Sequence, residues 1–523
     1  MLHHEVRRSF ATRVCIVAGS QSHDYQGAVI MKALKKLSKE PVEFIGVGGK
    51  RMESEDLDGS LIDVGLFRDK PFYPYKNFTT AHLEKIYHLP TWPTKWVNYQ
   101  TYNTLKGKNQ SGLKTIVDFQ PDVYLVLGNL FFMNKFYKDI ANLYQDRGIL
   151  KPPTTYYDSL VMNMNRSSQE WVDHMFYTVP REPVNWQKFK FPSTYVGKWV
   201  AQRALAYLYR NSPEYEKFVK ENTIYLNELY NQEIVEGLIA EEGKKFRSKH
   251  QIGDTATVMY TLPGNTSEEI QLAMPLIHAS VNQFVSKFTE GERAVAKENF
   301  VLVITTEEVF GKEVKEYVRS HSWPCKVILT ETAEEKYSAL AAGDLGLVMN
   351  GDAAVECAVY QLPTMVVDKS GFFDTYFALL YNSFTSDVNI ARNGEIYPEL
   401  HHGQANPAKV SDVWKDWYLK PKLRFRYVNL YEKYIPKFFP EVADQVSGDY
   451  KPKSIVKNNV EFKEHYFGDY LVAKKMLDAV EVFKTAGDKD VKKYDLPMVR
   501  KNLLEKLNPG YAYLAEDYLP QQQ

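Results

Sequence analysis

The stretch that decides the fold runs from Gly343 to Lys369 and reads GDLGLVMNGDAAVECAVYQLPTMVVDK. Its pattern predicts one strand-helix-strand unit: a buried strand over Asp344 to Met349, a turn at Asn350-Gly351-Asp352, a helix over Ala353 to Tyr360, a break at Pro363 and a strand over Thr364 to Asp368. A helix that opens on Gly-Asp presents unpaired backbone N–H groups at the carboxyl edge of a parallel sheet, where an anionic ligand such as a nucleotide diphosphate can sit. Glu356 lies one turn inside that helix, and we expect it to face the same crevice.

The same alternation of strand and helix extends over both halves of the chain. Short apolar runs that end in turn residues indicate further strands. They lie at Val14 to Gly19, Val42 to Val47, Val123 to Leu127, Thr154 to Tyr157, Met175 to Val179, Thr257 to Leu262, Phe300 to Thr305 and Lys326 to Leu329. The predicted fold class is α/β, with two Rossmann-like domains facing each other across a cleft, as in the GT-B class of nucleotide-sugar glycosyltransferases.

Helical segments separate and follow the two halves. A polar stretch with helix-period apolar positions lies between them, and another helix is expected at Tyr470 to Lys484. The expected domains are a targeting segment at 1–13, an N-terminal Rossmann-like domain at 14–197, a helical insertion at 198–250, a C-terminal Rossmann-like domain on the nucleotide side at 251–440, and C-terminal helices at 441–523 that cross back to the N-terminal domain.

Composition excludes several classes of protein. The 523 residues carry 65 basic and 65 acidic side chains, so we expect no nucleic-acid partner. The three cysteines are far apart in sequence, which is neither a disulfide framework nor a zinc pattern. No window approaches the roughly 18 apolar residues of a membrane span, so we expect a soluble or peripheral protein.

The first residues, MLHHEVRRSFATR, are basic and hydroxylated with a single acid, Glu5. This character is typical of a mitochondrial presequence, although an ordinary N-terminus is the alternative. The segment therefore predicts a mitochondrial location and leaves open whether it is cleaved.

Five runs together resemble one known family. They are Phe44 to Met52, Pro121-Asp122-Val123, Leu262-Pro263-Gly264 with Glu269, Asp344 to Val367, and Pro398-Glu399-Leu400. In these runs the chain resembles the bacterial lipid-A-disaccharide synthases, from about Arg13 to about Leu400. Those enzymes join a UDP-linked diacylglucosamine to a second lipid sugar. The resemblance implies a UDP-sugar donor and a lipid acceptor, with no cofactor and no metal.

The first half departs from the family at two loops. The family's first loop reads Ala-Gly-Glu-x-Ser-Gly-Asp, whereas here Ser20 replaces the acid and His23 replaces a glycine. A carboxylate that could act as a base is absent, and an imidazole stands where backbone must approach a substrate. After Val123 the family has a loop with two aspartates, where this chain has the run Gly128 to Phe132.

The second half departs at two further loops. The family's Pro-Gly-Ser-Arg becomes Pro263-Gly264-Asn265-Thr266, and threonine cannot neutralise a departing diphosphate as arginine would. The family's Ser-Gly-Thr-Ala becomes Asn350-Gly351-Asp352-Ala353. Asp352 caps its own helix well but repels a diphosphate.

The candidate site residues follow from what remains. The candidate catalytic residues are Asp24 and Glu356, and the candidate nucleotide-sugar-binding residues are Gly19, Ser22, Gly264, Asn265, Gly351, Glu356 and Glu399. Each has a structural alternative, since glycines serve turns, Asp24 can cap the helix expected over Tyr25 to Leu37, and Glu356 can satisfy a buried partner. His23 beside Asp24 is weak evidence for a new base, and His401-His402 with Glu399 is weak evidence for a metal site.

Two functions are compatible with this pattern. The first is a degenerate, non-catalytic member of the fold that serves as a structural or accessory subunit of a mitochondrial, membrane-associated complex, with vestigial UDP-sugar binding at most. The joint loss of the acid, the two aspartates and the arginine favours it, because losing several groups that act as a unit leaves little catalysis. The alternative is an active inverting glycosyltransferase that transfers a sugar from a UDP-sugar to a lipid acceptor.

Overall fold

The computed structural model of the chain divides into two compact units. The described residues are 11–19, 21–57, 61, 102–128, 130–158, 171–178, 192–210, 232–264, 267–289, 296–307, 310–349, 351–368, 386–392, 394–420, 422–423, 427, 430, 434–438, 467–487, 500, 502–503 and 505–506. The first unit comprises Met1–Trp199, Ala443–Pro452 and Glu464–Gln523, and the second comprises Val200–Val442 and Lys453–Lys463.

The first unit is built on a parallel sheet. Within the described residues its six strands have the order β2-β1-β3-β4-β5-β6. They are β1 (Thr12–Ala18), β2 (Val42–Val47), β3 (Val123–Leu127), β4 (Thr154–Asp158), β5 (His174–Tyr177) and β6 (Ser193–Tyr195). The central strands are almost wholly apolar because helices cover both faces of the sheet, so side chains of either direction are buried.

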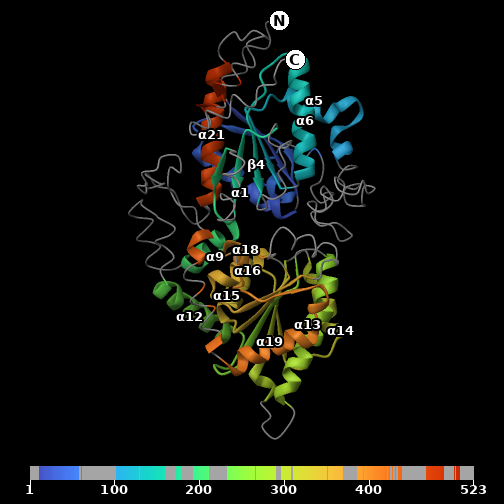
Figure 1. Ribbon diagram of the computed structural model, residues 1–523, viewed down its shortest axis with the longest axis vertical. Coiled ribbons are helices and arrows are strands. Elements are labelled where there is room, and N and C mark those ends of the chain that lie inside the picture. Colours follow the sequence, from blue (N-terminus) through green and yellow to red (C-terminus); the bar gives the residue numbers. More distant parts are fainter. Residues whose placement is uncertain are drawn as a thin grey trace. The chain divides into compact units, whose positions relative to one another are not determined.

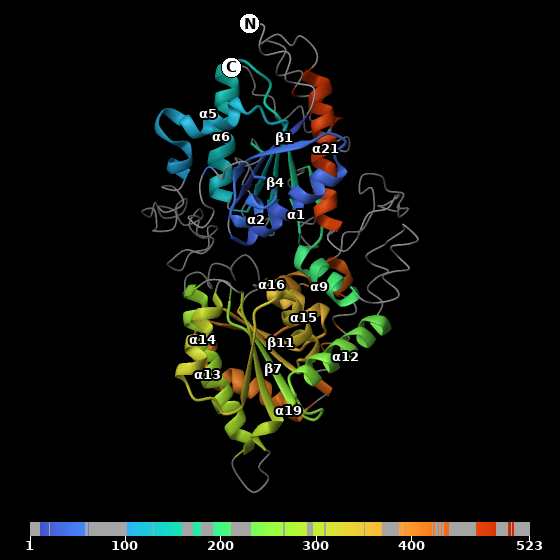
Figure 2. The ribbon, with the colours of Figure 1, turned by 180° about the vertical axis from the view of Figure 1, so that it is seen from behind.

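Helices on both faces complete the first unit (Figures 1 and 2). They are α1 (Gln21–Leu37), α2 (Lys50–Glu53), α5 (Ser111–Asp118), α6 (Leu130–Arg147) and, from the C-terminal part of the chain, α21 (Phe467–Gly487). Helices α1 and α21 pack against each other on one face, and α5 and α6 lie together on the other. Val472 and Met476 of α21 belong to the core of this unit, so a late segment of the chain completes an early domain.

The second unit has the Rossmann strand order. Within the described residues its parallel sheet runs β12-β11-β10-β7-β8-β9. The strands are β7 (Thr257–Leu262), β8 (Phe300–Thr305), β9 (Lys326–Thr330), β10 (Leu345–Val348), β11 (Thr364–Asp368) and β12 (Glu399–His401). Counted from β7, the strands lie in the order 6-5-4-1-2-3, which is the doubly wound arrangement of dinucleotide-binding proteins read from the other edge.

Its helices also form two layers. They are α9 (Trp199–Tyr209), which begins at the boundary of the first unit, α12 (Gln232–Lys249), α13 (Ser267–Thr289), α14 (Gly311–Ser320), α15 (Ala333–Ala342), α16 (Gly351–Val359), α18 (Asp387–Arg392) and α19 (Pro407–Leu419). Helices α13, α14 and α19 cover one face, while α12, α15 and α16 lie on the other (Figure 2). Phe284 and Trp414 meet edge to face inside the first of these layers, which fixes α13 against α19. Short 3-10 turns lie at Lys108–Gln110, Lys297–Asn299, His402–Gln404 and Ile435–Phe438.

The α/β class with two Rossmann-like domains is confirmed by the two parallel sheets. The unit quoted from Gly343 to Lys369 folds as β10, α16 and β11. Strand β1 begins at Thr12, inside the predicted targeting segment, whose residues 1–10 lie outside the described part of the chain. Residues 211–231 of the expected helical insertion also lie outside it. Among the helices that are described, none has the length and apolar character that crossing a membrane requires.

Candidate functional site

Each sheet has one point where the chain reverses its direction of travel across the strands. In the first unit this switch point lies between β1 and β3, and in the second between β7 and β10. Ligands of doubly wound proteins bind outside the carboxyl ends of the strands at such points. Gly19 follows β1, Gly264 follows β7, and Gly351 opens the helix after β10, so the sequence candidates flank the two switch points.

At the first switch point the loops after β1 and β3 lie side by side. The Gly19 N–H donates to the Leu127 carbonyl at 2.7 Å, and the Gly128 N–H donates to the Tyr157 carbonyl at 2.8 Å. Gly128 has φ +67°, and a Cβ atom built on it would lie 2.1 Å from Cε1 of His23. The His23 imidazole therefore occupies the space beside the Gly128 backbone, at the place where a doubly wound sheet receives its ligand.

Asp24 caps a helix other than its own. Its Oδ1 accepts hydrogen bonds from the backbone N–H groups of Gly49 at 2.6 Å and Met52 at 3.2 Å, and its Oδ2 accepts one from Arg51 at 3.2 Å. These N–H groups belong to the N-cap residue Gly49 and to the first turn of α2, and Gly49 has no side chain that could cap the helix. The interpretation that Asp24 caps the helix over residues 25–37 is wrong, because Asp24 lies within α1 and reaches across to α2. The side chain of Ser22 lies outside the described residues.

At the second switch point Gly264 is required by close packing. It has φ +126°, and a Cβ atom built on it would lie 2.4 Å from the Cβ of Glu269 in α13. Only glycine fits both this backbone conformation and this neighbour. Asn265, the next candidate, lies outside the described residues.

Glu356 is held by the neighbouring helix. The side chain is on α16, and the residue is only 3% exposed. Its Oε1 accepts a hydrogen bond from the Tyr337 hydroxyl at 2.7 Å, and its Oε2 forms an ion pair with the Lys336 ammonium. Both partners are on α15, so the carboxylate ties α16 to α15.

A layer of aromatic rings surrounds this ion pair. Tyr337 packs against Tyr207 with ring centroids 4.6 Å apart and stacks on Tyr360 at 5.7 Å. The Arg203 guanidinium lies 5.9 Å from the centre of the Tyr337 ring, a cation–π distance. The cluster joins α9, α15 and α16, so Glu356 belongs to a packed polar core. Asp352, in the first turn of the same helix, is half-buried and adds negative charge at the helix start.

Glu399 anchors a short helix to the edge of the second sheet. Its Oε1 accepts hydrogen bonds from the Ser386 N–H at 2.9 Å, the Ser386 hydroxyl at 2.6 Å and the Asn389 side-chain amide at 2.7 Å. Its Oε2 lies 3.2 Å from Nε2 of His401. These contacts fasten α18 to β12. Among the described residues, no group of three or more His, Cys, Asp or Glu side chains could hold a metal ion.

The structure thus places Asp24, Glu356 and Glu399 in the interior, each against groups of the protein itself. Apart from His401, which is two residues from Glu399, the partners of these carboxylates come from segments 10 to 28 residues away, and no local motif indicates those partners. The remaining departures from the family pattern, at Ser20, Asn129, Thr266 and Asn350, lie outside the described residues.

Comparison with known sequences finds similarity to lipid-A-disaccharide synthases. A profile described as Lipid-A-disaccharide synthetase matches residues 233–425. The chain is 24% identical over 447 residues to a protein named "Probable lipid-A-disaccharide synthase, mitochondrial" from Arabidopsis thaliana, covering 82% of this chain and 84% of that protein. It is 22% identical over 404 residues to a lipid-A-disaccharide synthase from Rhodospirillum centenum, covering 76% of this chain and 83% of that one.

Solved structures with a similar chain path are more distant in sequence. One is UDP-GlcNAc 2-epimerase from Neisseria meningitidis bound to UDP-GlcNAc, with a TM-score of 0.49, 11% identity, and coverage of 89% of this chain and 99% of that chain. Another is MurG from Acinetobacter baumannii, with a TM-score of 0.45, 8% identity, and coverage of 81% and 95%.

Proposed function

Because this chain is a divergent member of the lipid-A-disaccharide synthase family, we propose that it keeps the family fold without its catalysis. In this proposal it serves as a structural or accessory subunit of a mitochondrial, membrane-associated complex. The family membership rests on sequence likeness over about three quarters of the chain or more. The loss of catalysis and the role in a complex are the proposal.

The main support for the proposal is that the three retained carboxylates all accept hydrogen bonds from, or pair with, groups of the protein itself. Asp24 accepts three backbone hydrogen bonds, Glu356 pairs with a lysine and a tyrosine, and Glu399 holds Ser386, Asn389 and His401. A general base must reach the proton that it removes, directly or through one water. Buried carboxylates whose lone pairs are already used by partners within the protein are instead structural groups.

His23 and Asp352 support the same conclusion at the two switch points. The imidazole takes the space beside Gly128 in the first unit, where the family has a glycine at position 23. Asp352 places a carboxylate in the first turn of α16, where a diphosphate would be attracted by the helix dipole. Each change disfavours a nucleotide sugar by itself, one by steric exclusion and the other by charge repulsion.

The proposed location rests on the N-terminal composition and on one relative. Residues 1–13 are basic with a single acid, and the Arabidopsis relative bears the word mitochondrial in its name. The abundant tyrosine and phenylalanine, 36 and 28, provide large amphipathic side chains of the kind enriched at stable protein interfaces. Protein subunits are therefore the proposed partners, with a membrane surface or lipid nearby.

The second candidate is an active inverting glycosyltransferase that moves a sugar from a UDP-sugar to a lipid acceptor. What favours it is the Rossmann strand order of the second unit, which places Gly264 and Gly351 at the switch point. Binding of UDP or a UDP-sugar without turnover would be an intermediate state, a vestigial nucleotide site.

The size of the native protein tests the proposed role. The chain, tagged at its C-terminus and extracted from its own cells in mild detergent, is sized beside the purified recombinant chain in the same detergent. We expect the native chain to elute at a larger size and to bring a fixed set of proteins with it at constant ratio. A native chain that elutes with the recombinant monomer or homodimer contradicts the subunit role.

A further inference from the structure

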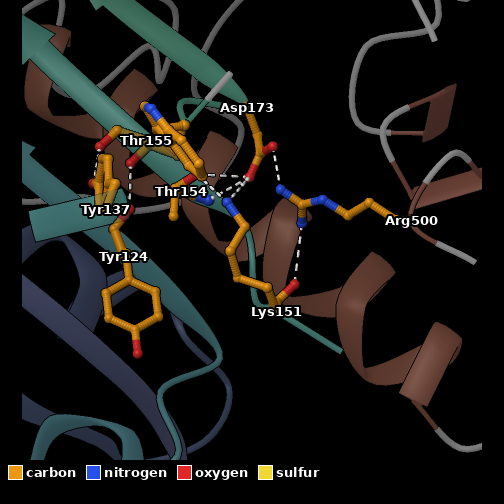
Figure 3. A network of polar contacts seen from close by, with 8 residues as sticks. Tyr124, Tyr137, Lys151, Thr154, Thr155, Asp173 and Arg500 are labelled. Carbon is orange, nitrogen blue, oxygen red and sulfur yellow. Dashed lines mark hydrogen bonds and ion pairs between the residues drawn. The ribbon is translucent and has the colours of Figure 1, made fainter. Parts of the chain in front are cut away.

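A buried polar network lies at the amino ends of β4 and β5, opposite the edge that carries the switch point (Figure 3). Asp173, just before β5, accepts hydrogen bonds through Oδ2 from the Thr154 N–H at 2.7 Å and the Thr154 hydroxyl at 2.8 Å. The Lys151 ammonium lies 3.6 Å from the same oxygen and donates to the Thr154 hydroxyl at 3.0 Å. The network therefore ties the starts of two adjacent strands together.

Arg500 enters this network from the C-terminal part of the chain. Its Nη2 pairs with Oδ1 of Asp173, and its Nη1 donates to the backbone carbonyl of Lys151 at 3.1 Å. Leu503, three residues later, is 1% exposed. The Arg500 guanidinium thus contacts both the Asp173 carboxylate and the Lys151 backbone. It attaches the C-terminal segment to residues that lie more than 300 positions earlier in the sequence.

The charges of this network do not balance if every group is ionised. Two cations, Lys151 and Arg500, share one carboxylate, and the side chains are only 14%, 20% and 7% exposed in the order Lys151, Arg500, Asp173. An uncompensated buried positive charge is costly. Arginine does not lose its proton in proteins, and Asp173 is held ionised by its two cationic neighbours, so Lys151 is the group that can restore neutrality.

We propose that Lys151 is a proton-controlled latch: the segment that carries Arg500 is held firmly when Lys151 is neutral and is loosened when Lys151 is protonated. The bonds that hold Arg500 need no proton from Lys151, because they use the Asp173 carboxylate and the Lys151 carbonyl. A neutral Lys151 still donates a hydrogen bond to Thr154.

The electrostatic shifts agree in direction with this geometry. Burial first, and then the Arg500 charge, lower the pKa of Lys151 to about 7, although Asp173 acts in the opposite sense. Burial alone would raise the pKa of Asp173, but Arg500 and Lys151 bring it below its usual value. Tyr137 also faces Asp173, and because its pKa is raised well above the ordinary value, chiefly by burial, its phenol stays neutral.

The sign of the linkage follows from the lowered pKa of Lys151. Burial and, after it, the Arg500 charge lower the pKa of Lys151, so binding of the Arg500 segment to the network favours loss of the Lys151 proton. Binding of the segment therefore becomes stronger as the pH rises above about 7. One proton is released, so the attachment constant rises at most about tenfold per pH unit. Below about pH 7 Lys151 is protonated in both states, and attachment stays at its weakest level.

Hydrogen exchange of the full chain tests the latch. Protection of the peptide that contains Arg500 and Leu503 is measured at about pH 6, 7 and 8 and corrected for the intrinsic pH dependence of amide exchange. In the native sequence we expect protection to rise between about pH 7 and 8, by up to about tenfold, and to be level below about pH 7. Lys151→Met removes the titrating group, so its protection is expected to be independent of pH, whereas Lys138→Met, which changes an exposed lysine of α6, keeps the native profile.

Two outcomes overturn the proposal. One is a level profile in the native sequence, and the other is a Lys151→Met protein that keeps the native slope. If Lys151→Met does not fold, as judged by circular dichroism, Lys151→Gln replaces it, because glutamine keeps a donor for Thr154 and carries no charge. The native profile by itself already decides whether a proton is released on attachment.

Discussion

The imidazole of His23 lies against the backbone of Gly128, so that a Cβ atom on Gly128 would be 2.1 Å from the ring carbon Cε1. His23 belongs to the first turn of α1, and Gly128 follows β3 directly. The two residues lie in the segments that follow β1 and β3, the two strands that flank the first switch point. A side chain of the protein therefore stands where a doubly wound sheet leaves room for a ligand.

Replacing Gly128 with alanine should destabilise the first unit. The new methyl group would meet His23 and would also be held at φ +67°, and we expect a loss of about 1 to 3 kcal/mol. Urea unfolding of the full chain, followed by fluorescence, measures the effect. Gly253→Ala is the matched control, because a Cβ built there has nothing within 4 Å, and it should change stability little.

The contact itself is isolated by adding His23→Ala to Gly128→Ala. Without the imidazole the new methyl group has room, so the loss of unfolding free energy from Gly128→Ala should fall to the part that comes from backbone strain. The effects of the two substitutions on stability should therefore be non-additive. Additive costs would show that His23 does not occupy the space beside Gly128.

Asp24→Ala should loosen the start of α2. The change leaves the N–H groups of Gly49, Arg51 and Met52 without their acceptor, and we expect a loss of about 1 to 3 kcal/mol. Hydrogen exchange of the peptide over 49–53 and urea unfolding measure it. Asp118→Ala, which removes a carboxylate that is 64% exposed and paired with Arg147, is the control and should cost little.

The Lys336–Glu356 ion pair predicts a pattern across three variants. Glu356→Ala leaves the Lys336 ammonium without its partner and should cost about 3 to 5 kcal/mol. Lys336→Met leaves a buried carboxylate and should cost a similar amount. The double variant Lys336→Met with Glu356→Met removes both charges and should recover much of the loss. Three equal losses in urea unfolding would contradict a coupled buried pair.

Because the Asp469 carboxyl group is buried, we expect the free energy of unfolding to change with pH. The carboxyl, on α21, is 1% exposed, and Gln26 on α1 donates a hydrogen bond to its Oδ1. Among the described residues, Oδ2 of Asp469 and Oε1 of Gln26 have no partner. A proton on Asp469 would let these two oxygens share it, so the acid and the amide would form a reciprocal pair.

Burial raises the pKa of Asp469 well above its ordinary value of 3.8, although the Gln26 hydrogen bond acts in the opposite sense. A raised pKa means that the stabilising contribution is complete below about pH 4 and is lost as the pH rises toward the folded-state pKa. Asp469→Asn supplies the second donor permanently, so it should stabilise the protein at neutral and higher pH by roughly 1 kcal/mol. The gain should shrink toward about pH 4.

Glu481→Gln, at an exposed position of the same helix, is the control for Asp469→Asn. An Asp469→Asn protein that is less stable than the native one at about pH 8 would contradict this prediction.

Much of the fold could be predicted because its signals are local. The apolar runs at 42–47, 123–127, 257–262, 300–305 and 364–368 coincide with β2, β3, β7, β8 and β11. Strands β6 and β12 were not predicted, since three residues with mixed burial give no periodic pattern. Helix α1 begins at Gln21, before the expected Tyr25, because the turn after β1 is short.

The site was harder to predict because its contacts are long-range. The sequence pattern places Gly264 and Gly351 beside a switch point, and the strand order agrees. The acceptor role of Asp24 depends on α2, about 25 residues later in the sequence. The Tyr337 partner of Glu356 lies on α15, which precedes β10 and α16 in the chain. Such pairings depend on how helices pack on the sheets, and no spacing within one segment encodes them.

The most direct test of the proposed loss of catalysis is a calorimetric titration of the purified full chain with UDP-N-acetylglucosamine and, separately, with UDP. We expect no binding heat at millimolar ligand, because His23 stands at the first switch point and Asp352 at the second. A lipid-A-disaccharide synthase from a bacterium, titrated under the same conditions, is the positive control. Micromolar binding followed by release of UDP in the presence of a lipid acceptor would contradict the proposed loss of catalysis and establish an active glycosyltransferase.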